Sequence, residues 1–345
     1  MNAPVFISGL RKSGTSLVKS LLDGHPDLFV YPPNELHLFR YSDHPALVKD
    51  KLARYKQPAR LLQAVAKTPF VRRMADRTSS FYLPEFDSNL FDRQINRQID
   101  PHKPIRLHEV FTGLMQAMYQ AIYKQSMPDR LRGVSKSVLE TEYFPEIRQM
   151  FPDSRFIYVL RNPYAHFVSA VRSMRTHTGK ANKRDGYEGM TLKALTHPYP
   201  FLGPELKRME HSYYFMQKYA RLYPDRFYVL VYDDLIADPR REMERLCRFL
   251  DLRFDEVLLR PTLMERPWKG NSWFNGDFEG IDRRPLEQWK QHIRAGEIRL
   301  VNRHFNRLIQ DYFELLETSG SIWAPFHRSE YKPWVYLANR LLYFL

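Results

Sequence analysis

The feature that most constrains this chain is a strand-to-helix turn close to its first residue. A short apolar run, Pro4–Ser8, has no helical period and is bounded by Gly9, so it predicts a buried strand. The segment GLRKSGTS follows, and leucines and a valine then recur on one helical face. A strand that turns through glycines into a helix N-terminus directs N–H groups at an anion, and the helix dipole favours negative charge there. The turn therefore predicts a phosphate-binding loop.

The loop has the glycine spacing, but not the lysine, of the loop that binds nucleoside triphosphates. Gly9 and Gly14 fit G-x-x-x-x-G-K-[ST], yet Thr15 occupies the lysine position and the cations are Arg11 and Lys12. Without that lysine, a Mg²⁺-centred phosphoryl transfer loses a main part. The loop suits an anion that needs backbone donors, hydroxyls and a nearby cation. An ordinary turn between a strand and a helix would explain the glycines, but it does not require adjacent Arg-Lys and Thr-Ser.

Composition indicates a globular protein with anionic partners. The chain has 345 residues, of which 43% are hydrophobic, and no run reaches the uncharged apolar length of a membrane-spanning helix. The early strand leaves no room for a signal peptide, and the single cysteine, Cys247, lies in an apolar helical pattern, so we expect a cytoplasmic protein. A net charge of +14 attracts anionic ligands, nucleic acid or anionic membranes without choosing among them. Because no nucleic-acid-binding motif is found, we expect no nucleic-acid partner.

Five strand-like runs predict an α/β fold with a parallel sheet. Four of them are followed by helical patterns, or by a loop and then a helix, which favours a sheet covered by helices on both faces. The runs are Val5–Ser8, Leu28–Tyr31, Gly133–Ser135, Arg155–Leu160 and Phe227–Val231. Ligands of such sheets bind at the carboxyl ends of the strands. We therefore expect the functional residues at that edge.

We expect a single α/β domain over residues 1–320 with two insertions. The first, about residues 40–130, has helical patches and no convincing strand, and it would cap the sheet and shape an acceptor cleft. The second, about residues 175–204, is polar, basic and punctuated by Gly and Pro, and we expect it to be mobile. A helix over residues 204–223 follows.

The C-terminal tail, residues 321–345, has two interpretations. Apolar residues recur there at helical spacing, namely Trp334, Leu337, Leu341 and Phe344. Such a helix could lie on the inner membrane surface as a peripheral contact, or it could pack on the domain or on a second subunit. The sequence leaves this choice and the oligomeric state open.

Charged side chains follow the predicted second and third strands. Glu35 comes just past the second strand, where a carboxylate near Lys12 could take a proton from an acceptor hydroxyl or amine. The alternative is a carboxylate that complements a helix start. His37 could orient that base or contact the acceptor, or be an ordinary solvated or packed histidine. Lys136 ends the third strand and could reach a bridging oxygen, although a lysine in such a loop is often only solvated.

Two later motifs add cations and hydroxyls. Arg161 follows the fourth strand, a helix begins at Pro163, and Ser169 lies on that helix. An arginine at a strand end can bind phosphate bidentately. The segment RPWKGNSWF carries a glycine loop that could close over a second phosphate through Lys269, Gly270, Asn271 and Ser272. By itself it indicates only a turn.

Together these motifs resemble the sulfotransferases that use 3′-phosphoadenosine 5′-phosphosulfate (PAPS). RKSGTS is similar to their 5′-phosphosulfate loop, RNPYAHFVS to their 3′-phosphate motif, and VYDDLIADP to a segment near their last core strand. WKGNSW followed by RRPLEQWKQHI resembles the closing loop and next helix of bacterial members, and YPPNELHLF resembles the base segment of heparan-type sulfotransferases. The resemblance covers roughly residues 4–39 and 130–315. Two departures are that Leu10 replaces the usual proline, and that GVSKSV lacks the proline of the family's K-T-P motif.

The resemblance implies a P-loop-type fold and a role for each matched position. Glu35 would be the general base, and Lys136 would match the lysine of the K-T-P motif. Arg161 and Ser169 would bind the 3′-phosphate. The remaining cofactor contacts would come from the 5′-phosphosulfate loop, a tyrosine and the closing loop: Arg11, Lys12, Ser13, Gly14, Thr15, Ser16, Tyr232, Lys269, Gly270, Asn271 and Ser272.

The implied reaction is an in-line transfer of the sulfuryl group from PAPS to an acceptor, with 3′-phosphoadenosine 5′-phosphate (PAP) as the product and no metal. The basic charge and the heparan-like segment favour a carbohydrate or glycolipid acceptor, while tyrosine or a small molecule stays open. The rival interpretations are a P-loop kinase or nucleotide hydrolase, and a non-enzymatic module that binds anionic polymers or membranes.

Overall fold

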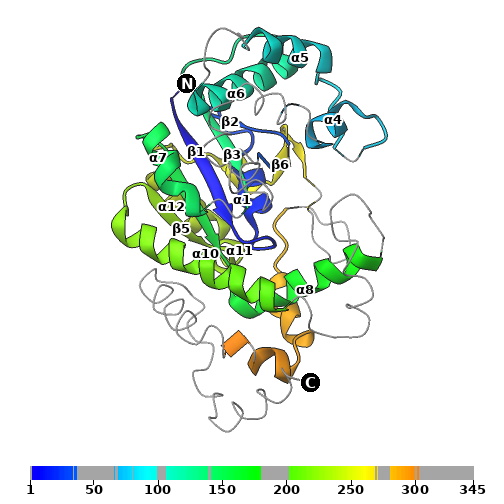
Figure 1. The fold of residues 1–345 in the computed structure, drawn as a ribbon, viewed down its shortest axis with the longest axis vertical. Helices are drawn as coiled ribbons and strands as arrows, with labels where there is room; N and C mark the ends of the chain where they lie inside the picture. The colour runs from blue at the N-terminus through cyan, green and yellow to red at the C-terminus, as the bar shows by residue number, and fades with distance from the viewer. Residues whose placement is uncertain are drawn as a thin grey trace, which may run out of the picture.

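The structure is a computed structural model, shown as a ribbon in Figure 1. The residues that it describes are 2–33, 35–36, 66, 69–79, 81–98, 106–138, 141–179, 202–268, 270, 280–299 and 301–302. Among these described residues, no helix is both long enough and apolar enough to cross a membrane.

The centre of the molecule is a five-stranded sheet in the order β2-β3-β1-β4-β5. All four neighbouring pairs are parallel, so the predicted parallel sheet is confirmed. The strands are β1 (Asn2–Gly9), β2 (Leu28–Val30), β3 (Arg132–Lys136), β4 (Arg155–Leu160) and β5 (Phe227–Val231). The central position of β1 places the loop that follows it between the carboxyl ends of β3 and β4.

The sheet is buried on both faces because successive side chains of a strand point in opposite directions. In β1, Phe6 joins one core while Val5 and Ile7 join the other, and in β4 Tyr158 and Val159 divide in the same way. The first core is covered by α6 (Leu107–Tyr123), α7 (Phe144–Met150), α8 (Pro163–Gly179) and α10 (Leu202–Leu222). The second is covered by α1 (Thr15–Leu22), α11 (Tyr232–Ala237) and α12 (Pro239–Leu250), where Cys247 is buried as its pattern indicated.

The described part of residues 40–130 is helical, as predicted. It contains α4 (Pro69–Ala75), α5 (Ser88–Arg97) and α6, and α5 and α6 lie together at one end of the molecule (Figure 1). α6 packs directly on the sheet, with the rings of Phe111 and Phe6 centred 5.2 Å apart. Residues 40–65 lie outside the described residues, and the acceptor cleft expected from this insertion stays a prediction.

Helix α8 continues further than the sequence interpretation placed it. The sequence predicts a mobile insertion from about residue 175, yet α8 runs to Gly179 because no proline or glycine interrupts the chain between Pro163 and that residue. α10 begins at Leu202, slightly before the predicted start. Residues 180–201 and the tail from residue 303 lie outside the described residues.

A short hairpin after α12 was not predicted. Strands β6 (Thr262–Leu263) and β7 (Arg266–Pro267) pair antiparallel, just before the predicted closing loop. The carboxylate of Asp23, at the end of α1, accepts from the Thr262 hydroxyl at 2.7 Å and from the Glu265 backbone N–H at 2.9 Å. The hairpin is therefore attached to the helix that begins at the glycine loop.

Candidate active site

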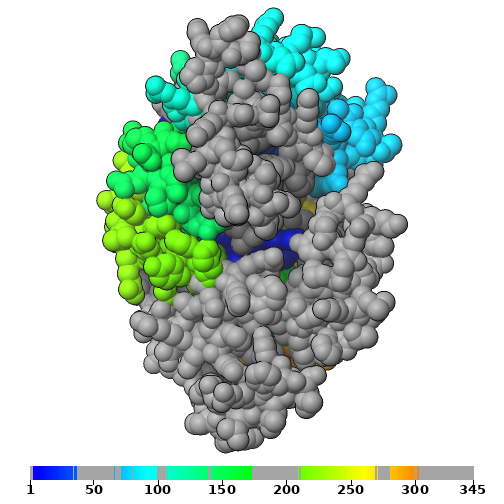
Figure 2. Space-filling model, viewed as in Figure 1, coloured from blue at the N-terminus to red at the C-terminus, as the bar shows by residue number. Residues whose placement is uncertain are grey.

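The glycine loop after β1 has a backbone that most residues cannot adopt. Gly9 and Gly14 have φ angles of 145° and 103°, and Lys12 also lies at a positive φ of 68°. The Ser13 hydroxyl donates to the Leu10 carbonyl at 2.7 Å and closes the turn. Gly14 then caps α1, so the positive end of that helix dipole faces the loop. The N-terminal region that contains the loop reaches the surface near the middle of the face in Figure 2.

The ends of β4 and β5 meet this loop. Arg161, which follows β4, donates from Nη1 to the Lys12 carbonyl at 2.8 Å. Its guanidinium carbon lies 4.8 Å from the ring centre of Tyr232, the first residue after β5. A Cβ atom added to Gly14 would lie 2.1 Å from that same ring. Arg161 and Tyr232, which lie far from the loop in the sequence, are therefore brought against it.

Residues on α8 support the loop from behind. The ring of His166, which is fully buried, donates from Nε2 to the Arg11 carbonyl at 2.8 Å. Asn162 begins the helix, because its side-chain oxygen accepts from the Tyr164 N–H at 3.0 Å. Its own backbone N–H donates to the buried carboxylate of Asp233 at 2.8 Å, which joins the end of β4 to the start of α11. These contacts were not predicted, although the RNPYAH and YDD segments contain the residues that support the loop.

The segment 31–36 carries a carboxylate to the other side of the loop. Glu35 lies 2.8 Å from the ammonium group of Lys136, with side-chain exposures of 13% and 3% respectively. The backbone N–H of Leu36 donates to the Lys136 carbonyl at 3.0 Å, so the segment runs beside the end of β3. The predicted base and the predicted lysine thus form a partly buried ion pair at the carboxyl edge of the sheet.

The cations of this edge interact with one another. Burial lowers the pKa of Lys12, and the charges of Arg11, Lys136 and Arg161 lower it further. Burial also lowers the pKa of Lys136, against the opposing effect of Glu35. The strand ends therefore concentrate positive charge around the loop, where a bound anion would be stabilised.

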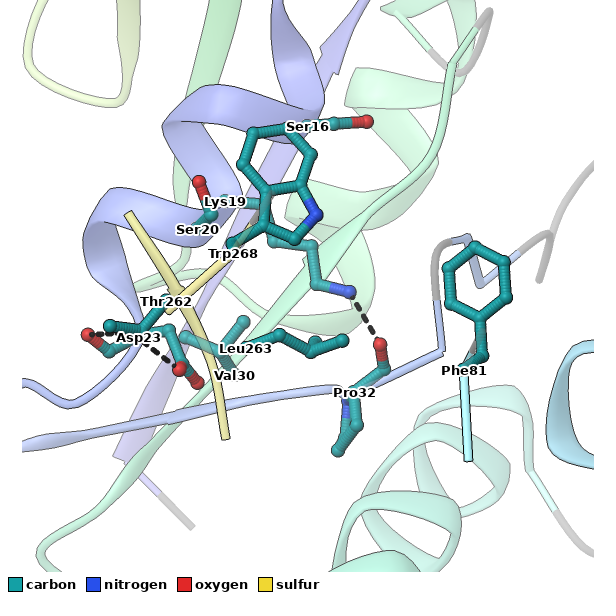
Figure 3. Close-up of a pocket in the computed structure, with 10 residues that line it drawn as sticks. All are labelled: Ser16, Lys19, Ser20, Asp23, Val30, Pro32, Phe81, Thr262, Leu263 and Trp268. Atoms are coloured by element: carbon teal, nitrogen blue, oxygen red, sulfur yellow. Dashed lines mark hydrogen bonds between the residues drawn. The ribbon is translucent and has the colours of Figure 1, made fainter. Parts of the chain in front are cut away.

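Lys19, on the second turn of α1, is a further cation that the sequence analysis did not single out. It is 5% exposed, and burial lowers its pKa to about 7. It lies at a pocket lined by α1, by the hairpin and by Pro32, with Trp268 and Phe81 on opposite sides (Figure 3). In sequence it occurs among the leucines of an amphipathic helix, where a lysine usually indicates the solvent side.

The structure brings together residues 11–16, Glu35, Lys136, Arg161 and Tyr232. Ser169 is buried on α8, one turn beyond His166, whose ring contacts the loop. Gly270, the one residue of the predicted closing loop 269–272 within the described residues, has a positive φ of 78°. Four other predicted site residues lie outside the described residues: His37, Lys269, Asn271 and Ser272. Among the residues that the structure does describe, no three His, Cys, Asp or Glu side chains form a group that could hold a metal ion.

The donor set fits an organic anion that carries phosphate groups. The Nε atom of Arg161 is buried and has no hydrogen-bond partner within the described part of the chain. Lys12 and Arg161 supply charged donors beside a glycine loop that opens a helix, which is the chemistry that phosphate and sulfate oxygens require. These residues therefore suit a ligand with phosphate groups at two neighbouring strand ends.

Sequence comparison identifies the family. Residues 4–256 match the model of the sulfotransferase family. The chain belongs to the sulfotransferase family. An uncharacterised protein of Aquifex aeolicus (strain VF5) is 24% identical over 293 residues, which are 84% of this chain and 30% of the relative. The chain thus spans about a third of the length of that curated relative.

Solved sulfotransferase domains share the fold of this chain. The sulfotransferase domain of the Synechococcus PCC 7002 olefin synthase is 18% identical, with a TM-score of 0.57 over 90% of this chain and 96% of the domain. The sulfotransferase domain from the curacin biosynthetic pathway is 19% identical, with a TM-score of 0.52 over 89% of this chain and 98% of the domain. At these identities the likeness establishes the architecture.

Proposed function

We propose that this protein is a sulfotransferase that moves the sulfuryl group of PAPS to a hydroxyl or amine of an acceptor. The observation that carries the proposal is the contact between Arg161 and the Lys12 carbonyl at 2.8 Å, because it places the cation of the β4 end against the loop of the β1 end. A ligand with phosphate groups at both ends of an adenosine needs two such anion sites side by side. Membership in the sulfotransferase family supports the same reaction.

The residues divide between the two ends of the donor. Residues 11–16 would hold the 5′-phosphosulfate, with the loop amides and the start of α1 facing its oxygens. Arg161 and Ser169 would hold the 3′-phosphate. Tyr232 would lie beside the nucleoside, together with the closing loop of residues 269–272. PAPS supplies an activated sulfuryl group and leaves as PAP.

Glu35 would act as the general base. Its carboxylate accepts the proton of the acceptor as the new bond to sulfur forms and the bond to the departing phosphate breaks. Lys12 and Lys136 then stabilise the negative charge that develops on that phosphate. Because Lys136 lies 2.8 Å from Glu35, one lysine can serve the base and the leaving group in succession. His37 would contact the acceptor or orient the base.

The acceptor class is argued from charge and from the base segment. A net charge of +14 favours an acidic partner, and YPPNELHLF resembles the base segment of heparan-type sulfotransferases. We therefore propose a carbohydrate or glycolipid acceptor, met in the cytoplasm or at the inner membrane surface. Lipid flotation of the full chain and of a form without residues 321–345 tests the membrane part, which requires that only the full chain floats with anionic vesicles.

Two experiments test the proposed function. In a thermal-shift assay, PAP should raise the melting temperature, whereas ATP with Mg²⁺ should raise it much less. Incubation with ³⁵S-labelled PAPS and fractionated host glycans, lipids and peptides should then label a glycan or glycolipid fraction. A larger stabilisation by ATP with Mg²⁺, together with no labelled fraction, would favour a kinase or nucleotide hydrolase instead.

A further inference from the structure

The backbone of the segment that carries Glu35 is hydrogen-bonded to β3 near both of its ends. The Tyr31 N–H donates to the Val134 carbonyl at 2.9 Å, and the Leu36 N–H donates to the Lys136 carbonyl at 3.0 Å. Five residue steps on this segment thus span two steps on β3, so the chain must bulge between the two bonds. Pro32 and Pro33 occupy the bulge, and neither has an N–H with which to pair. The conformation before Glu35 therefore depends on what binds the two proline carbonyls.

Lys19 binds both of them. Its ammonium nitrogen lies 2.9 Å from the Pro32 carbonyl oxygen (Figure 3). It also lies 2.7 Å from the Pro33 carbonyl oxygen, and the side chain is buried. Lys19 extends from α1, which begins at the phosphate-binding loop. One side chain thus connects the helix of the loop to two prolines that lie two and three residues before the base.

We infer that Lys19 is a positioning residue that fixes Glu35 relative to Lys136 and the glycine loop by holding the Pro32 and Pro33 carbonyls. The inference rests on the proposed function, because it assigns Glu35 the role of base. It assigns Lys19 no contact with the reacting atoms. A base displaced by about 1 Å can cost on the order of a hundredfold in rate, so this support matters to catalysis.

The support does not require that Lys19 be charged. A neutral amine has two N–H donors, which suffice for two carbonyls, and an ammonium has three. The charged groups that face Lys19 act in both directions, since Lys136 disfavours its charge while Asp23 and Glu35 favour it. The bonds of Lys19 to the two proline carbonyls are therefore expected to persist on both sides of neutral pH.

Loss of stability alone does not test this inference. Lys19→Met removes the donor of the two proline carbonyls, so we expect its melting temperature to fall whether or not Lys19 positions Glu35. The melting temperature therefore serves to confirm that the variant is folded at the assay temperature. A residue kept only for stability would leave kcat unchanged in the folded variant.

The test compares Lys19→Met with Ser20→Ala, a neighbour on α1 whose hydroxyl donates to the Leu17 carbonyl. With labelled PAPS and the fraction that the wild type labels, kcat of Lys19→Met should fall about tenfold to a hundredfold, while KM for PAPS stays within about twofold. Ser20→Ala should match the wild type. In the Glu35→Gln background, Lys19→Met should produce no further loss, because a residue that acts through Glu35 is not additive with it.

A crystal structure of Lys19→Met decides the inference without any acceptor. We expect the contact of Glu35 with Lys136, 2.8 Å in the wild type, to be lost or displaced. An intact contact with unchanged kcat would overturn the inference. If the wild type transfers no sulfuryl group at all, the proposed function fails instead. The position of Glu35 in the variant then still tests whether the bonds of Lys19 to the two prolines fix Glu35.

Discussion

The ends of β1, β4 and β5, which we call the donor half of the site, are joined differently from the ends of β2 and β3, the acceptor half. In the donor half, Arg161 and His166 each bind a backbone carbonyl of the glycine loop at 2.8 Å, and Tyr232 packs on Gly14. In the acceptor half, Glu35 is held by the Lys136 ion pair and by a bulge that Lys19 supports.

This difference separates binding from chemistry. The donor half is held by several contacts with the loop backbone, so it should bind an adenosine bisphosphate whether or not the acceptor half is intact. The acceptor half depends on a few lysine contacts, so small changes there should reduce turnover and leave nucleotide affinity unchanged. Variants in the two halves should therefore produce opposite patterns.

The largest expected effect comes from the acceptor half. Glu35→Gln keeps the shape of the side chain but removes the base, so turnover should fall about a hundredfold to ten-thousandfold. PAP affinity, measured by calorimetry, should stay within a fewfold of the wild type. The control is Glu256→Gln, an exposed carboxylate paired with Arg240. Full turnover in Glu35→Gln would show that Glu35 is not the general base.

The reverse pattern is expected in the donor half. Arg161→Met removes both a contact with the loop and the cation proposed for the 3′-phosphate, so PAP should bind about a hundredfold more weakly. The affinity for AMP, which has no 3′-phosphate, should fall by a smaller factor. Arg240→Met, which changes an exposed arginine of α12, should leave both affinities unchanged. An equal loss for PAP and AMP would show that Arg161 supports only the loop.

Gly14 tests how tightly the donor half is packed. Gly14→Ala requires a side chain at a φ of 103° and within 2.1 Å of the Tyr232 ring, so the free energy of unfolding should fall by about 2 kcal/mol. Gly280→Ala also has a positive φ, but its Cβ meets no atom of the described residues within 4 Å, and it should cost less. Denaturant titration of the two variants measures the difference. Equal losses of unfolding free energy would mean that backbone strain alone, without the contact with the Tyr232 ring, accounts for the glycine at position 14.

The smallest expected effect is a pH dependence of donor binding. The pKa of Lys12 lies below its usual value because of burial and neighbouring cations, and a bound phosphate would raise it again. Binding should then take up protons, so PAP affinity should fall as pH rises above neutral towards the usual lysine pKa of about 10.4. Lys12→Met should flatten this profile. Calorimetry in buffers of different ionisation enthalpy measures the proton uptake directly, and proton release would contradict the assignment.

The donor half was largely predictable from sequence, because its signals are local. Glycine spacing marks the turn after β1, an apolar run followed by an arginine and a proline marks the end of β4, and parallel strands bring such ends to one edge. The same rule placed Glu35 and Lys136 together. No such rule indicates that Arg161 binds the Lys12 carbonyl, since that bond depends on how β4 is placed beside β1.

Lys19 could not be predicted for a similar reason. Helical periodicity does not predict that a lysine between Val18 and Leu21 is buried. Lys19 is buried because the Pro32–Pro33 bulge packs against α1. The β6–β7 hairpin was missed because two-residue strands show no period, and Asp23 anchors it through tertiary contacts. Non-local packing thus determined the features that sequence reasoning did not find.

The central claim is that one adenosine donor spans the loop after β1 and the end of β4. A crystal structure of the complex with PAP tests this claim most directly. We predict the 5′-phosphate against the amides near Thr15 and the 3′-phosphate between Arg161 and Ser169, with Glu35 facing the space beyond the 5′-phosphate. A 3′-phosphate bound away from Arg161 and Ser169 would contradict the account.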